Sequence, residues 1–171
     1  YITKLGFPGA AAVAGAIVAI YWLLMLVGRF VSSFISGVVS SRTQLIVTSS
    51  LAIILLIIAI MLPESLAVTF RGSQVPMKAF FIIACGLCTS VMWGGIFNLA
   101  TEGLGKYTAS ASGIFMMMVV GGGVMPFIQD VLSTKVLGYI GSYWLVVAML
   151  AYLLYYALIG CKNVNKDIPV E

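Results

Sequence analysis

Five long apolar runs, nearly free of charge, are the feature that most restricts how this chain can fold. They cover residues 10–39, 44–62, 77–101, 108–132 and 139–160. A helix of about 20 residues crosses a hydrocarbon core about 30 Å thick. Backbone groups in lipid need internal partners, which favours helices over an open sheet, and the alternating segments of about ten residues that build a membrane barrel are not found in the sequence. The sequence therefore predicts an all-α integral membrane protein with about five transmembrane helices.

Composition agrees with a lipid environment. Of the 171 residues, 62% are hydrophobic and 8% are charged, whereas a soluble domain has roughly a quarter of its residues charged. The nine basic residues stand apart between apolar runs, so the net charge of +4 forms no patch that would bind nucleic acid.

The start of the chain does not look like a signal peptide. Tyr1 is the first residue, and no basic segment or small-residue cleavage site accompanies the first apolar run. We expect the sequence to begin inside a longer protein. Residues 161–171 are expected to form a short polar tail.

The sequence offers little for metal or redox chemistry. Cys85 and Cys88 lie within one apolar run, Cys161 follows the last run, and there is no histidine. We therefore predict no metal site and no cofactor. The cysteines are expected to pack as small apolar side chains, and the methionines of the 116–118 triplet are expected to be packing filler and not a metal site.

Three of the five runs carry polar or small residues at helical spacing. The stripes contain Tyr21, Met25, Arg29, Ser32 or Ser33, and Ser36 in the first; Gly86, Ser90, Trp93 or Gly94, Asn98 and Thr101 in the third; and Gly113, Met117, Gly121, Met125 and Gln129 in the fourth. Such stripes face other helices or an aqueous path, and close packing through small residues is the simpler explanation for the glycines. The runs at 44–62 and 139–160 are apolar on all sides, as expected of helices that face lipid.

The order of striped and apolar helices fits a repeated triplet. Many transporters contain three-helix repeats of inverted topology. If a triplet consists of two striped helices and one apolar helix, the first two runs are the end of an incomplete triplet. This pattern predicts one further striped helix immediately upstream.

Arg29 is the most informative charge in the sequence. It precedes Arg42 by thirteen positions, which is about 20 Å along a continuous helix. A charge well inside the bilayer costs at least about 2.5–3.5 kcal/mol unless it is paired or hydrated. Arg29 is therefore a candidate for a gating ion pair or for hydrogen bonding to a solute, and an arginine that snorkels to the interface is the alternative.

Helix flexing is predicted in the fourth run. Gly121, Gly122 and Gly123 are followed by Pro126, and proline removes one internal hydrogen bond. Such a segment suits a helix that bends during alternating access, although close packing against a neighbour explains the same glycines.

Two carboxylates lie at predicted helix ends, Glu102 and Asp130. Both are expected to be solvated; the alternative is that Glu102 forms a latch with Arg42 or Lys106.

The charges of the loops do not show which side of the membrane is cytoplasmic. The basic residues of the loops are divided four against four between the two sides. The positive-inside rule therefore does not fix the orientation.

One segment resembles a known family. Residues 86–130, GLCTSVMWGGIFNLATEGLGKYTASASGIFMMMVVGGGVMPFIQD, are similar to the tenth and eleventh helices of the fucose:proton symporter family, which lies within the major facilitator superfamily and includes bacterial glucose/galactose transporters. The Gly28-Arg29-Phe30 sequence resembles the eighth-helix motif of that family. By this resemblance the five runs correspond to helices eight to twelve of a twelve-helix fold, and residues 1–6 to the end of helix seven.

The resemblance implies cation-coupled uptake of a monosaccharide, usually with protons, at the bacterial inner membrane. It implies a cytoplasmic location for Arg42, for the loop between Glu102 and Lys106, and for the tail. The acidic coupling residues of such symporters lie in the amino-terminal half. That half of the same chain is therefore an expected partner.

We accordingly expect a hexose transporter rather than an enzyme. Sugar hydroxyls need convergent hydrogen-bonding groups, and the apolar side of the ring needs an aromatic surface. Tyr21, Asn98 and Gln129 are the predicted polar substrate residues, and Trp93 is the predicted stacking residue. The alternative function is a small membrane scaffold or subunit without transport of its own. A membrane enzyme has little support, because no Ser/His or paired-carboxylate constellation lies in the runs.

Overall fold

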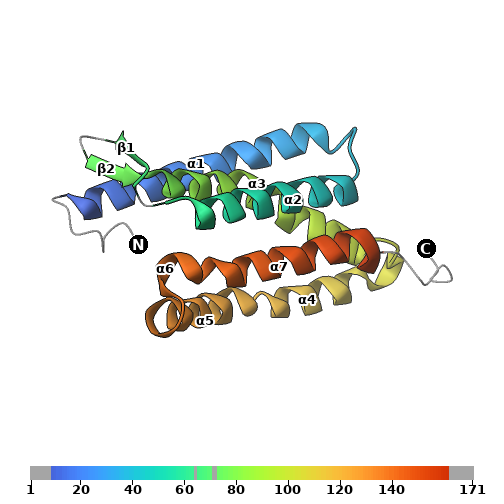
Figure 1. Cartoon of the computed structure of the whole chain (residues 1–171). Helices are drawn as coiled ribbons and strands as arrows, with labels where there is room; N and C mark the ends of the chain where they lie inside the picture. The colour runs from blue at the N-terminus through green and yellow to red at the C-terminus, as the bar shows by residue number, and fades with distance from the viewer. Residues whose placement is uncertain (1–8, 64, 71–72, 162–171) are drawn as a thin grey trace.

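The architecture is a set of membrane-length helices. The computed structural model describes residues 9–63, 65–70 and 73–161. Within these residues, five helical spans have the length and apolarity needed to cross a membrane: α1 (Ala10–Ile35), α2 (Ser41–Met61), α3 (Met77–Thr101), the span Gly105–Lys135 and the span Gly138–Gly160 (Figure 1). The chain is thus an all-α membrane protein. The expectations for residues 1–6 and for the tail beyond Cys161 lie outside the described residues.

The first helix is shorter than expected. It ends at Ile35, not at residue 39, and the chain turns before Ser40 caps α2 by accepting a hydrogen bond from the Thr43 amide at 3.3 Å. Serine is a preferred N-cap residue because its side-chain oxygen accepts a hydrogen bond from a free backbone amide of the first helical turn. Arg29 and Arg42 consequently lie on different helices, so their separation in sequence does not measure the depth of Arg29.

The fourth span is interrupted, although one helix over 108–132 was expected. A 3₁₀ turn, η2 (Gly105–Tyr107), leads into α4 (Thr108–Met118), and α5 (Gly121–Lys135) follows. Around the break, the amides of Val119 and Gly122 donate to carbonyls only three residues earlier, which is 3₁₀ geometry. The three glycines form the first turn of α5 and Pro126 lies inside it. Helix flexing at these residues remains a prediction.

The fifth span also has irregular ends. It begins with the single turn α6 (Gly138–Gly141), continues as α7 (Tyr143–Tyr155), and closes with a π-helical turn, η3 (Tyr156–Gly160).

A β-hairpin that the sequence analysis did not anticipate connects α2 to α3. Strands β1 (Ala67–Phe70) and β2 (Ser73–Pro76) pair antiparallel, with Val68 opposite Val75. Val75 is fully buried in a cluster that includes Val13 and Ile17 of α1 and Ile83 of α3. The hairpin therefore closes one end of the contact between α1 and α3 (Figure 1).

Helix α2 is buried on one side and exposed on the other, so its apolar surface serves both helix packing and the expected contact with lipid. It packs against α3 on one flank and α7 on another. Its buried residues recur every three or four positions and are Leu45, Ser49, Ala52, Leu56 and Ala59. With Cys85, Cys88 and Met92 of α3 and Val147 and Leu150 of α7, most of them form the main apolar cluster. On the opposite side, Val47 and Ile54 are exposed. The two cysteines pack as small apolar groups, as predicted.

Two glycines allow α1 and α3 to pack closely. A Cβ atom at Gly28 would lie 2.8 Å from the Leu87 carbonyl oxygen and would overlap Ser90 Oγ, and a Cβ at Gly86 would lie 2.7 Å from the Tyr21 ring. The striped faces of these two helices therefore meet. Small residues at membrane helix interfaces allow this backbone approach.

Arg42 ties the start of α2 to the end of the fifth span. Its Nε donates to the Ala157 carbonyl at 2.9 Å, and its Nη2 donates to the Leu158 carbonyl at 2.7 Å. Carbonyls at the end of a helix carry partial negative charge and have no helical donor. The planar guanidinium of Arg42 donates hydrogen bonds to two of these carbonyls at the same time.

Replacing Arg42 with alanine is expected to reduce the free energy of unfolding by about 1–2 kcal/mol, because two charge-assisted hydrogen bonds are lost at a partly solvated site. Arg42→Lys should lose part of this amount, because an ammonium lacks the planar fork. Thermal unfolding in detergent provides the measurement. Lys135→Ala, which removes an exposed cation at the end of α5, is the control. Equal effects of Arg42→Ala and Lys135→Ala would argue against the anchoring role.

Candidate functional site

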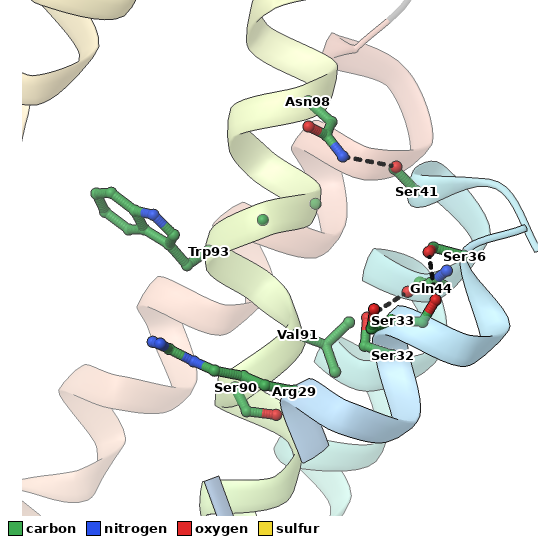
Figure 2. A pocket seen from close by; sticks show the side chains of 12 residues that line it. Arg29, Ser32, Ser33, Ser36, Ser41, Gln44, Ser90, Val91, Trp93 and Asn98 are labelled. Carbon is green, nitrogen blue, oxygen red and sulfur yellow. Dashed lines mark hydrogen bonds between the residues drawn. The ribbon is translucent and has the colours of Figure 1, made fainter. Parts of the chain in front are cut away.

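A polar cavity of about 330 Å³ lies where α1, the start of α2 and the second half of α3 converge. Figure 2 shows Arg29 and Trp93 extending to the same side of α3, while the serines of α1 lie near Gln44. The lining residues come from α1 (Arg29, Ser32, Ser33, Ser36), α2 (Ser41, Gln44) and α3 (Ser90, Val91, Trp93, Gly94, Gly95, Asn98).

The cavity reaches from the middle of the helices toward one end. Gly28 packs on Ser90, and Ser90 is near the centre of the 25-residue helix α3. Arg29 therefore lies roughly 15–20 Å from either end of α3, at a rise of 1.5 Å per residue. Asn98 is in the last turn of α3. Polar groups at such depth are expensive in lipid unless they face a cavity or a partner.

Gln44 stabilises the α1 side of the cavity. Its Oε1 accepts a hydrogen bond from Ser32 Oγ at 2.9 Å, and its Nε2 donates to the Val39 carbonyl at 2.9 Å. Gln44 thus connects the body of α1, the turn after it and α2. The sequence analysis missed Gln44, because it stands at the border of a run that is otherwise apolar. An isolated amide at a predicted span boundary was the available signal.

Several serine hydroxyls in the cavity already donate their proton within the protein, so they offer a solute mainly acceptor oxygens. Ser32 donates to Gln44, Ser36 to the Ser33 carbonyl and Ser90 to the Leu87 carbonyl. Each hydroxyl has one proton and two lone pairs, so these oxygens can still accept. The Arg29 guanidinium and the Trp93 indole N–H supply donors. A neutral solute with several hydroxyl groups matches both kinds of group.

Trp93 packs in a cluster of three aromatic rings with Phe97 and Phe115. Phe115 of α4 lies edge to face with Trp93 and with Phe97, at 5.3 Å between ring centroids in each pair. Trp93 is still 44% exposed. Trp93 is also one of the residues that line the cavity, and packing against Phe115 of α4 sets the orientation of its ring.

The structure brings two of the four predicted substrate residues together. Trp93 and Asn98 line the cavity, and the Asn98 amide donates a long hydrogen bond of 3.4 Å to Ser41 Oγ. Tyr21 lies in the contact between α1 and α3, where its hydroxyl is 3.3 Å from Thr89 Oγ1. Gln129 lines a separate pocket of about 280 Å³ with Pro126, Asp130 and Tyr143. Substrate binding by these residues remains a prediction.

The predicted latch residues also share a pocket. Arg42 and Glu102 line a depression of about 580 Å³, together with Ser40, Asn98 and Cys161. In this structure the Arg42 guanidinium binds the carbonyls that end the fifth span, and the described residues include no ion pair between Arg42 and Glu102. Lys106 lies over the Tyr107 ring, with 5.5 Å between Nζ and the centroid.

Sequence comparison identifies relatives of this chain. A glucose/galactose transporter of Brucella abortus biovar 1 is 32% identical over 146 residues, which cover 85% of this chain and 32% of that protein. A putative glucose/galactose transporter of Helicobacter pylori is 30% identical over 147 residues, which cover 84% of this chain and 33% of that protein. The chain thus spans about a third of the length of these relatives. No family model and no solved structure matches it significantly.

Proposed function

This chain belongs with the bacterial glucose/galactose transporters of the major facilitator superfamily, and we propose that it is part of a secondary active transporter that takes up a hexose by alternating access. The cavity lined by Trp93 and Asn98 would form one wall of the sugar site. The rest of the transporter, including an amino-terminal half, would supply the other wall. The relatives' names are those of transporters, and nothing in them favours a scaffold without transport or an enzyme.

The polar cavity is the observation that supports this proposal best. A chain with mean hydropathy +1.15 places an arginine, several serines, two amides and a tryptophan around one space between its spans. A hexose has polar hydroxyls around its edge and an apolar ring face. The serine oxygens and the Asn98 amide suit the hydroxyls, and the exposed part of Trp93 suits the ring face.

We further propose proton coupling and a bacterial inner membrane location. In this arrangement the cavity opens toward the cytoplasm, because Asn98 lies near the helix ends that carry Arg42 and Glu102. The five spans would correspond to helices eight to twelve of the twelve-helix fold. Residues that carry the proton would then belong to the amino-terminal half.

Uptake by the full-length transporter in proteoliposomes tests the proposal. We expect accumulation of labelled glucose or galactose, with fucose and a non-sugar as comparison solutes, and we expect an imposed proton gradient to stimulate it. Sugar uptake that does not respond to the proton gradient would contradict proton coupling. A folded preparation that takes up no sugar would refute the assignment of the cargo.

The site itself is tested by Trp93→Ala and Asn98→Ala. Each substitution should raise the KM for the sugar about tenfold, which corresponds to about 1.4 kcal/mol of lost binding. Trp93→Phe should retain most of the affinity, because an aromatic face remains. Trp144→Ala, which removes an exposed tryptophan of α7, serves as the control. An unchanged KM in both cavity variants would exclude this cavity as the sugar site.

A further inference from the structure

Arg29 lies at a depth where a charge requires compensation. The contact between Gly28 and Ser90 fixes it beside the middle of α3, and its side chain is exposed. A guanidinium stays protonated in proteins. The helix that carries Arg29 ends six residues later, at Ile35, which is about 9 Å along its axis. Snorkelling reaches only about the length of one side chain, and the Arg29 side chain extends to the same side as Trp93, away from Ser36 and Ser41 near the end of α1 (Figure 2).

The described part of the chain offers no counter-charge at this depth. The acidic residues there are Glu102, which caps the end of α3, and Asp130, which lies in the second half of α5. Arg29 makes no hydrogen bond or ion pair with another described residue, and the other residues that line its cavity are neutral. A neutral hexose would supply hydroxyl acceptors but no compensating charge.

We propose that Arg29 forms an ion pair with a carboxylate contributed by a part of the transporter outside this chain. The proposal rests on the function proposed above, in which this chain is one wall of a central cavity. Arg29 and Trp93 extend to the same side of α3 (Figure 2), so the carboxylate approaches Arg29 next to the predicted sugar-stacking residue. Removal of one member of such a pair leaves the other charge unpaired in a poorly hydrated space, which is the costly state.

Double-mutant cycles in the full-length transporter test this pairing without sugar. Arg29→Gln is combined in turn with neutralisation of each aspartate and glutamate in the membrane spans outside this chain, and the thermal unfolding midpoint is measured in detergent. We expect Arg29→Gln and one particular neutralisation each to lower the midpoint by several degrees, and the double variant to recover most of the loss.

Arg42→Gln is the matched control for these cycles, because its guanidinium binds carbonyls of the fifth span. Its effect should add to that of every neutralisation. If Arg29→Gln is likewise additive with all of them, the ion pair is refuted. Should single neutralisations prevent folding, the exchanged pair, Arg29→Glu with the acid changed to arginine, is expected to fold.

Disulfide formation provides a second readout that does not depend on stability. Cys85, Cys88 and Cys161 are first replaced by serine or alanine, and Arg29→Cys is then combined with cysteine at the coupled acidic position. Oxidation should join the two positions, and failure to join them contradicts the pairing. If coupling and cross-linking are observed while no sugar is transported, the ion pair stands and only the cargo assignment fails.

Discussion

Replacing Gly28 with valine is expected to lower the free energy of unfolding by about 3 kcal/mol and to abolish uptake by the full-length transporter. A Cβ atom at this position would lie 2.8 Å from the Leu87 carbonyl oxygen, and a helix backbone cannot retreat as a flexible side chain can. Overpacking of this kind forces the helices apart at a cost of about 1–3 kcal/mol, occasionally more. Because Arg29 and Ser90 line the cavity beside this contact, the separation also disrupts the site.

Gly15→Val is the matched control, since it makes the same change in the same helix. No atom lies within 4 Å of a Cβ built at Gly15. Valine has a higher helix propensity than glycine, so the control should be neutral or slightly stabilising. Thermal unfolding in detergent and sugar uptake are measured for both variants. If Gly28→Val unfolds at the same temperature as Gly15→Val, close packing at Gly28 does not hold α1 against α3.

Replacing Val75 with aspartate is expected to have a similar or larger effect, at least about 3 kcal/mol. Val75 is fully buried between the hairpin and the first turns of α1 and α3. A carboxylate placed there loses its hydration among the apolar side chains of this cluster, and burial of a charged group is strongly unfavourable. The hairpin should therefore detach, and the backbone amides of β1 should exchange hydrogen faster.

Val68→Asp controls for the added charge and for the change in strand propensity. Val68 is the cross-strand neighbour of Val75, and it is 38% exposed. Its aspartate remains hydrated, so we expect less than about 1 kcal/mol of destabilisation. Thermal unfolding and hydrogen exchange distinguish the two variants. Comparable losses for both would show that strand pairing, and not the burial of Val75, holds the hairpin in place.

The polar residues of the site were only partly accessible from sequence. Helical spacing placed Arg29, Ser90 and Asn98 on inward faces, because polar side chains at membrane depth rarely face lipid. Spacing along one helix does not say how far two helices are shifted along each other. Tyr21 therefore lies in the contact between α1 and α3, and Gln129 lies in another pocket. Gln44 joins the cavity across the turn between α1 and α2, which begins four residues earlier than predicted.

The sequence did not predict the hairpin or the buried face of α2, and the physical reason differs between the two. The hairpin strands are only four residues each, and the position of Val75 depends on Val13 and Ile17 of α1, which are more than fifty residues away in sequence. Helix α2 is apolar on all sides, so no contrast in polarity marks the face that packs. Only the tertiary structure selects the side with Ser49, Ala52 and Ala59, whose small side chains let neighbouring helices approach.

By itself, the sequence determined that the chain resides in lipid, that it does so as helices, and that it has about five spans, which agrees with the five found among the described residues. These properties follow from the length and apolarity of each segment, which depend on the solvent and not on neighbouring segments. The tertiary structure decided which faces of those helices meet, where the spans are interrupted and which polar groups share one cavity. Those properties depend on side-chain shape and on contacts between distant segments, because lipid and helix surfaces are equally apolar and hydrophobicity does not discriminate among packings.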